Sequence, residues 1–485
     1  MIDNLSDKNL FVEKAYVNGK WQHAYSEKTF EVTGPADGKV IGKVPDMSTA
    51  ETRDAVEAAR MALEKWKAFS ASERARLLKK WHSLMVEKAG DLARILTVEQ
   101  GKPLDEARGE IMYGASFVEW FAEEARRVYG DVIPGPTRDT RIVVIKQPIG
   151  VVGAITPWNF PNAMITRKIA PALAAGCTVV VKPASQTPFS ALALAKLAEE
   201  AGFPPGVINM VTGASASTIG EELTRNPAVK KISFTGSTKT GKLLMKQSAD
   251  TVKKISLELG GNAPFIVFDD ADIEEAVHGA IASKYRNAGQ TCVCANRIFV
   301  QSSIAEAFTE QYVKAVKALK VGNGLEKDTD IGPLINEEAV KNVEQLVAQA
   351  IEAGAERITG GKPHALGGLF YEPTVLCNVT SAMDIAKEEI FGPVSAIFQF
   401  DTEEEVIGEA NHTPYGLASY FYGSDISRIW RVAEALEYGM VGVNTGSIST
   451  TVAPFGGIKE SGFGREGSRY GIEEYVITKY LNFKI

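Results

Sequence analysis

A polar segment of small residues surrounds one cysteine of this chain. Residues 287–297 read Asn-Ala-Gly-Gln-Thr-Cys-Val-Cys-Ala-Asn-Arg, which places Cys292 three positions after Gly289. Small side chains and a permissive glycine backbone expose a thiol, and an exposed thiolate is a nucleophile. The segment alone leaves the assignment open, because a cysteine is more often an inert buried residue than a catalyst.

A second segment could bind a pyrophosphate. Residues 230–242 read Lys-Lys-Ile-Ser-Phe-Thr-Gly-Ser-Thr-Lys-Thr-Gly-Lys, so a strand ends at a turn around Gly236 and a helix follows with Gly241 in its first turns. Backbone N–H groups at the start of a helix form an anion site. An ordinary capped turn would have the same sequence. Residues 462–467 match G-x-G-x-x-G, but they follow a loop-like stretch and not the strand that this fingerprint requires.

Strands alternate with helices from about residue 150 onward, and this pattern predicts a parallel sheet. In the first block we expect helices at 187–202, 215–225 and 238–249, and strands at 150–155, 178–182, 206–211 and 231–235. In a second block, from 256 to about 465, we expect strands at 265–268, 297–300, 395–400 and 440–443. Ser48 and Glu51 fit a capping box that starts a helix over 48–66, and a second helix starts near Ser70. Two segments that alternate like strands, 140–147 and 474–485, fit neither block.

The composition is that of an ordinary soluble globular protein. The chain has 485 residues, which suggests about three domains, and its net charge is −7. No basic block marks a nucleic-acid partner. The apolar runs are the length of a strand, too short for a membrane span, and residues 1–11 lack the features of a signal peptide.

The cysteines and histidines bear on compartment and metals. Four cysteines in a chain of this length do not form a disulfide framework, so we expect a reducing cytoplasm. The five histidines do not combine with cysteines at metal-ligand spacing, so we expect no metal site.

Taken together, three strings carry a resemblance to a known family. Glu258-Leu-Gly-Gly, the segment around Cys292, and Glu389-Ile-Phe-Gly-Pro resemble the NAD(P)-dependent aldehyde dehydrogenase superfamily over nearly the whole chain. The string that starts at Pro454 is a further signature of that family. The resemblance implies an α/β fold with a Rossmann-like cofactor domain, an α/β catalytic domain and a small β oligomerisation arm.

The resemblance also assigns catalytic roles. The pattern Gly-Gln-x-Cys implies that Cys292 is the nucleophile, which converts an aldehyde to a hemithioacetal that can release hydride. Asn159, between two prolines, matches the residue that stabilises the oxyanion together with the backbone N–H of Cys292. Glu258 matches the general base that activates water for thioester hydrolysis, and its apolar neighbours should raise its pKa toward neutrality. Cys294 could act as a redox partner of Cys292, or be only a small buried residue.

For the cofactor, the resemblance implies NADP or NAD. Many relatives that use NAD have a glutamate three residues after the lysine of Val-Val-Val-Lys, where it binds the ribose hydroxyls. Here that position is Ser185, which does not repel a 2′-phosphate, and Lys182 could attract one, so NADP is favoured. Glu389 and Phe391 match the residues that hold the nicotinamide ribose and ring. The remaining cofactor residues that the match implies are Trp158, Gly213, Phe234, Thr235, Gly236, Ser237, Gly241 and Leu259.

The substrate implied is a small aldehyde with a distal carboxylate. Arg286 lies six residues before Cys292, Arg167 lies eight residues after Asn159, and Ser449 follows the last expected strand. Relatives that oxidise succinate semialdehyde, as in 4-aminobutyrate breakdown, have two arginines and a serine at these places. The chain therefore resembles the succinate-semialdehyde dehydrogenases most closely.

The expected division assigns 1–125 and 148–255 to the cofactor domain, 256–465 to the catalytic domain, and 126–147 with 466–485 to the arm. Unpaired strand edges in the arm would recruit another subunit, so we expect a homodimer or homotetramer.

Three alternative functions stay open at this point. The first is a dehydrogenase of glutarate semialdehyde, the second is a relative that has lost catalysis, and the third is a CoA-acylating relative, against which Glu258 argues.

Overall fold

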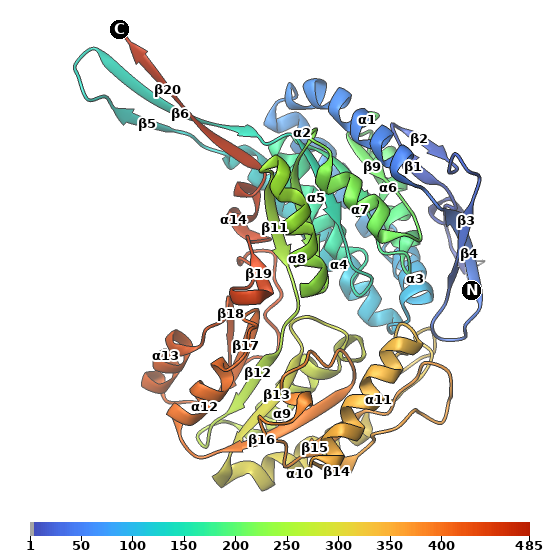
Figure 1. Ribbon diagram of the computed structural model, residues 1–485, viewed down its shortest axis with the longest axis vertical. Helices are drawn as coiled ribbons and strands as arrows, with labels where there is room; N and C mark the ends of the chain where they lie inside the picture. Colours follow the sequence, from blue (N-terminus) through green and yellow to red (C-terminus); the bar gives the residue numbers. More distant parts are fainter. Residues whose placement is uncertain (1–3) are drawn as a thin grey trace.

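The first of two large sheets contains the strands that precede the cofactor and oxyanion segments. In the computed structural model, which describes residues 4–485, its strand order is β19-β11-β10-β7-β8-β9-β1-β2 (Figure 1). The central strands run parallel, and the strands at both edges are antiparallel. The strand bounds are β1 Ala15–Val17, β2 Lys20–Gln22, β7 Val151–Ile155, β8 Thr178–Lys182, β9 Ile208–Met210, β10 Val229–Thr235, β11 Lys254–Glu258 and β19 Gly462–Phe463. Strands β7 and β8 are buried throughout, as a sheet covered on both faces requires.

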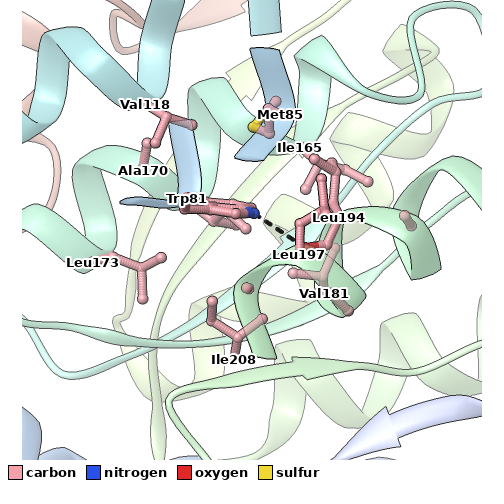
Figure 2. Packing of buried hydrophobic residues seen from close by; sticks show 14 of the residues in the cluster. Trp81, Met85, Val118, Ile165, Ala170, Leu173, Val181, Leu194, Leu197 and Ile208 are labelled. Atoms are coloured by element: carbon pink, nitrogen blue, oxygen red, sulfur yellow. Dashed lines mark hydrogen bonds between the residues drawn. The ribbon is translucent and has the colours of Figure 1, made fainter. Parts of the chain in front are cut away.

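Helices with strong start signals cover this sheet. Ser48 and Ser70 each form a capping box with a glutamate three residues later, and these boxes start α1 and α2. Trp81 of α2 is fully buried, and its Nε1 donates to the carbonyl oxygen of Leu194 at 3.1 Å (Figure 2). The helices of this part are α1 Thr49–Lys67, α2 Ala71–Glu87, α3 Ala89–Gln100, α4 Leu104–Glu124, α5 Ala163–Ala175, α6 Pro188–Ala201, α7 Ala216–Arg225, α8 Thr238–Ser248 and α14 Ser468–Glu473.

The second sheet has its own hydrophobic core and contains the strand after the cysteine segment. Its order is β14-β15-β16-β13-β12-β17-β18, and all neighbours are parallel except β14 and β15. Its strands are β12 Ala263–Val267, β13 Ala295–Gln301, β14 Glu356–Thr359, β15 Thr374–Cys377, β16 Val394–Phe400, β17 Ala418–Tyr422 and β18 Met440–Val443. Its helices are α9 Ile273–Tyr285, α10 Ala305–Ala318, α11 Glu337–Glu352, α12 Glu403–Asn411 and α13 Ile426–Ala435.

A three-stranded antiparallel arm projects from the body of the molecule (Figure 1). Its strands are β5 Asp131–Pro134, β6 Thr140–Pro148 and β20 Val476–Lys484, and β6 pairs with β20 along its whole length. The two segments that fitted neither block are thus partners in one ribbon. A separate hairpin joins β3 Thr29–Thr33 to β4 Val40–Pro45.

The expected strands and helices are present, with ends that differ by a few residues. The strand expected at 206–211 is shorter, Ile208–Met210, and β11 extends the first sheet past the expected boundary at 255. Residues 466–475 contain α14 and pack on the body. Of the segment 466–485 that was expected in the arm, only β20 therefore belongs to it. No helix within residues 4–485 is long and apolar enough to cross a membrane. Residues 1–3, part of the N-terminal segment considered for a signal peptide, lie outside the described range.

Candidate active site

Cys292 and the three expected substrate residues line one cavity. Its volume is about 310 Å³, and its walls come from α4, α5 and the loops around residues 291, 449 and 455. Cys292 is half-buried, because it is open to the cavity and enclosed by protein elsewhere. The lining residues are Lys102, Glu106, Gly109, Glu110, Tyr113, Phe160, Met164, Arg167, Arg286, Thr291, Cys292, Val293, Ser449 and Phe455. The fold thus places a thiol and two guanidinium groups on one enclosed surface.

The backbone before the nucleophile adopts an unusual conformation. Asn287, Ala288 and Gly289 have φ values of 54°, 55° and 74°, in the left-handed region that favours glycine. A Cβ on Gly289 would lie 2.1 Å from the carbonyl oxygen of Gly392, so this position requires glycine for space as well as conformation. The side chain of Asn287 holds the turn, because its Nδ2 donates to the carbonyl oxygen of Asn159 at 3.1 Å.

The thiol of Cys292 is protonated at neutral pH. Burial raises its pKa to about 12, and the carboxylates of Glu389 and Glu258 act in the same direction. The charges of Arg167 and Arg286 lower that pKa but do not prevail. A base must therefore remove the thiol proton before attack.

Asn159 lies within the same hydrogen-bonded network. Its Nδ2 donates to the carbonyl oxygen of Gln290 at 3.0 Å, and a carboxamide nitrogen has a second N–H to offer. Among residues 4–485, no backbone carbonyl accepts the N–H of Cys292. The helix that follows, α5, begins at Ala163, so Arg167 lies a little more than one turn into it.

Glu258 ends β11 in a buried position. Burial raises the pKa of its carboxyl well above the usual value, and the negative charge of Glu466 adds to this effect. Both carboxyl oxygens are buried and lack a hydrogen-bond partner within the described chain. The rise in the pKa of Glu258 agrees with the expectation from its apolar neighbours. A carboxyl with a raised pKa can accept and release a proton near neutral pH.

The two arginines differ in their partners. Arg167 is buried and forms an ion pair with Glu466, Nε to Oε2 at 2.5 Å, while its Nη2 has no partner among the described residues. The guanidinium of Arg286 lies 5.3 Å from the ring centre of Phe160. No carboxylate within residues 4–485 pairs with Arg286, which leaves its charge for a ligand. Ser449 lies in the loop after β18, as expected.

Several cavity residues carried no motif in the sequence. Lys102 is buried, and its Nζ contacts Glu110 at 2.6 Å and the carbonyl oxygen of Asn159 at 2.8 Å. Glu110 in turn accepts from the backbone N–H of Asn162 at the start of α5. Glu106 accepts from the N–H of Asn287 at 2.9 Å. The helical spacing of Glu106 and Glu110 in α4 was the only sequence signal for a shared helix face.

The turn after β10 fits the expected phosphate site. Ser237 caps α8 by accepting from the N–H of Thr240, so the first turn of α8 presents free N–H groups. A Cβ on Gly236 would lie 2.5 Å from the ring of Phe234, and one on Gly241 would lie 2.5 Å from Leu259. The N–H of Gly236 itself donates to the carbonyl oxygen of Glu258. Thr235 ends β10 and is buried.

Lys182 and Ser185 lie at and after the end of β8. Lys182 is buried, its ammonium forms no ion pair within residues 4–485, and burial lowers its pKa to about 8. Ser185 is half-buried, and its Oγ donates to Gln186. Gly213 follows β9, where a Cβ would lie 2.9 Å from the carbonyl oxygen of Met47. An unpaired buried ammonium is costly without an anion, so the site fits a 2′-phosphate.

A second cavity lies between α11 and the segment around Glu389. Trp158 and Phe391 line it, with their rings 5.6 Å apart in an edge-to-face arrangement. Glu389 accepts from the N–H of Gly261 at 3.1 Å, and burial raises its pKa to about 7. These residues fit the ring and ribose of a nicotinamide.

Cys294 does not line the catalytic cavity. It is buried, and its Sγ donates to the carbonyl oxygen of Lys284 at 3.4 Å. Its thiol is free, as is that of Cys292. Gly462–Gly467 lacks the strand-turn-helix order of a dinucleotide fingerprint, because Gly462 itself belongs to a two-residue edge strand antiparallel to β11.

Comparison with known proteins agrees with this geometry. The aldehyde dehydrogenase family model matches residues 21–481. Glutarate-semialdehyde dehydrogenase of Pseudomonas aeruginosa and the NADP(+) succinate-semialdehyde dehydrogenase GabD of Escherichia coli are each 60% identical over 477 residues, which cover 98% of this chain and 99% of theirs. A solved succinate-semialdehyde dehydrogenase from Burkholderia pseudomallei is 60% identical, with a TM-score of 0.99 over 99% of this chain and 100% of that chain. The chain belongs to the aldehyde dehydrogenase family and has its fold.

Proposed function

We propose that this protein oxidises succinate semialdehyde to succinate with NADP⁺, and less efficiently with NAD⁺. The observation that carries the proposal is one enclosed cavity with a thiol, Cys292, and two arginines, Arg167 and Arg286. An aldehyde at the thiol would have its distal carboxylate within a positively charged part of the wall. Charge-assisted hydrogen bonds to a carboxylate are stronger than neutral ones, so they select this substrate.

In this reaction Cys292 is the nucleophile. Its sulfur adds to the aldehyde carbon, and its proton passes to a base. The oxyanion accepts from the second N–H of the Asn159 carboxamide and from the backbone N–H of Cys292. A nicotinamide held by Trp158, Glu389 and Phe391 would supply the hydride acceptor, and loss of hydride from the hemithioacetal leaves a thioester on Cys292. Glu258 then removes a proton from water, the resulting hydroxide attacks the thioester, and the thiolate of Cys292 leaves.

For the cofactor, the residues present fit a phosphorylated dinucleotide. The first turn of α8 would hold the pyrophosphate, with Gly236 and Gly241 giving the space and Ser237 the cap. Lys182 would hold the 2′-phosphate beside Ser185, where no carboxylate repels it. Phe234, Thr235 and Leu259 would line the groove, with Gly213 at its side, and Trp158, Glu389 and Phe391 would hold the nicotinamide ribose and ring.

Steady-state kinetics on two aldehydes and two cofactors test the proposal. We expect a much higher kcat/KM for succinate semialdehyde than for butanal, which has the same chain length without the carboxylate. Arg286→Ala should reduce that preference by about ten- to a hundredfold, because a charge-assisted hydrogen bond contributes about 1.5–3 kcal/mol. Equal loss on both aldehydes would show that Arg286 is structural.

Glutarate semialdehyde is a second candidate, because a relative with that name is as similar to this chain as GabD is. The same cavity holds both, and the two substrates differ by one methylene. The kcat/KM values for the two semialdehydes decide between them. A methylene changes such ratios by about 10- to 200-fold at most.

We also propose that the arm of β5, β6 and β20 joins subunits into a homodimer or homotetramer. Its strands have exposed apolar side chains, which include Val132, Ile477, Tyr480 and Phe483. Exposed apolar groups on an unpaired ribbon favour association. The division into cofactor, catalytic and arm regions, the cytoplasmic location and a redox role for Cys294 stay predictions.

A further inference from the structure

The wall of the catalytic cavity contains a tyrosine that the reaction described above does not use. Tyr113 lies in α4, and its spacing from Glu106 and Glu110 places the three residues on one face of that helix. All three line the cavity with Cys292. The ring of Tyr113 packs edge-to-face against Phe117, with ring centres 4.9 Å apart, so its orientation is held from behind.

The hydroxyl of Tyr113 is buried and has no hydrogen-bond partner within residues 4–485. A buried polar group without a partner destabilises a fold, and native proteins seldom retain one. Two other residues of the same cavity wall have a buried donor in this state, Arg167 at Nη2 and Thr291 at its hydroxyl. Three residues that line the space for the substrate therefore have buried donors without protein acceptors.

The charges around the phenol indicate which part of a substrate it meets. Burial raises the pKa of Tyr113, so the phenol keeps its proton and is a donor at neutral pH. The positive charges of the Arg167 and Arg286 guanidinium groups act in the opposite direction on this pKa. The phenol therefore shares the cavity wall with two cations that an anionic group of a substrate would approach.

We propose that Tyr113 is a specificity-determining residue whose hydroxyl donates a hydrogen bond to the distal anionic group of the substrate, beside Arg167 and Arg286. This inference rests on the proposed function, because it requires an aldehyde with a distal carboxylate in the cavity. It adds a fourth protein group, from α4, to the three residues that the sequence indicated.

The test is Tyr113→Phe, which keeps the ring and its packing on Phe117 and removes only the hydroxyl. We expect kcat/KM for succinate semialdehyde to fall about tenfold, the loss of one hydrogen bond to a charged group, while kcat/KM for butanal stays unchanged. The thermal midpoint without substrate should not fall, because the lost hydroxyl had no partner in the fold.

Tyr371→Phe is the matched control. Tyr371 is also buried with an unpartnered hydroxyl, but it lies in the core of the second sheet and outside the cavity. We expect this variant to have the wild-type kcat/KM for both aldehydes. Equal losses on both aldehydes in Tyr113→Phe would place the hydroxyl at the reacting end, and no loss on either would remove its role. Either result overturns the inference about Tyr113, provided that the wild-type enzyme prefers succinate semialdehyde to butanal. A wild-type enzyme without that preference would instead contradict the proposed function, and the inference with it.

Discussion

At the scale of single residues, the thiol that we propose as nucleophile is inactive at rest. The pKa of Cys292 is raised to about 12, so almost no thiolate exists at neutral pH before a base acts. Glu258 is buried, and its pKa is also raised, which suits a carboxyl that accepts a proton. The site thus combines a protonated thiol with a separate carboxyl whose raised pKa suits the later hydrolysis step.

Replacement of the nucleophile should separate chemistry from binding. We expect Cys292→Ala to abolish turnover and to leave the Kd for NADP⁺ nearly unchanged, because Cys292 bonds the aldehyde and does not line the second cavity. Cofactor fluorescence and NADPH production measure the two effects. The control is Cys294→Ala, which should keep activity because Cys294 is buried away from the cavity. An active Cys292→Ala with an inactive Cys294→Ala would reverse the assignment.

The buried ammonium of Lys182 predicts a pH effect on cofactor choice. Burial lowers its pKa to about 8, so the group is charged below that pH and becomes neutral as the pH rises through it. Affinity for NADP⁺ should therefore weaken above about pH 8, while affinity for NAD⁺, which has no 2′-phosphate, should change little. Calorimetric titration of both cofactors across that range measures the difference.

A negative charge introduced at Ser185 provides the variant for this prediction. Ser185→Glu should shift the ratio of kcat/KM toward NAD⁺, because a carboxylate repels the 2′-phosphate. A parallel pH dependence for both cofactors in the wild type, or an unchanged ratio in the variant, would show that other residues set the preference.

Sequence motifs predicted some of the site residues, and the fold revealed the others. Cys292, Asn159 and Arg286 could be found from sequence strings because each lies in a short local pattern. Lys102 and Tyr113 could not, because they reach the cavity only through the packing of α4 and the residues just before it. The pairing of Glu466 with the cavity residue Arg167 likewise depends on how the loop before α14 packs on α5. Lysines, glutamates and tyrosines on helices are common, and sequence spacing does not show which face meets a ligand.

At the scale of elements, α4 supports both halves of the site. Lys102, just before α4, contacts the carbonyl of Asn159, and Glu106 within it holds the backbone of Asn287. The segment that presents the oxyanion donor and the turn before the nucleophile are thus tied to one helix. Capping boxes predicted α1 and α2 from sequence, but α4 starts after Pro103 without a side-chain cap, so the sequence offered no comparable signal.

The buried ion pair of Lys102 and Glu110 should stabilise the fold. Lys102→Met leaves the carboxylate of Glu110 buried without its partner, and breaking such a pair costs about 3–5 kcal/mol. We expect a clear fall in the thermal midpoint, measured by scanning calorimetry. Lys102→Met combined with Glu110→Leu should recover part of the loss, because no charge then remains buried.

The control for this prediction is Lys80→Met, at an exposed lysine of α2, which should change stability by no more than about 0.5 kcal/mol. If Lys102→Met is as stable as Lys80→Met, the pair does not support the fold.

At the scale of the whole molecule, the arm projects from the body and exposes apolar side chains to solvent. Alternation predicted β6 and β20 from sequence because a ribbon has a strict period of two. β5 gave no such signal, since it has only four residues, all exposed, and ends in proline. The order of strands in the two large sheets could not be predicted from the sequence, because it depends on pairing between distant segments.

Charges on the arm should reduce the size of the assembly. We expect the wild type to be a dimer or tetramer and Val132→Glu with Tyr480→Glu to give a smaller species, because both side chains are largely exposed on the arm and apolar. Light scattering after gel filtration measures the mass. Met61→Glu, at an exposed apolar residue of α1, is the control and should not change it. A monomeric wild type would contradict the role of the arm.

The central claim is that oxidation proceeds through a thioester on Cys292 that Glu258 hydrolyses. Glu258→Gln, mixed with succinate semialdehyde and NADP⁺ in a stopped-flow instrument, should produce a burst of about one NADPH per active site and then almost none. Mass spectrometry of the quenched protein should find one succinyl group, on the peptide that contains Cys292. Steady NADPH production without an adduct, or an adduct on Cys294 instead, would contradict the account.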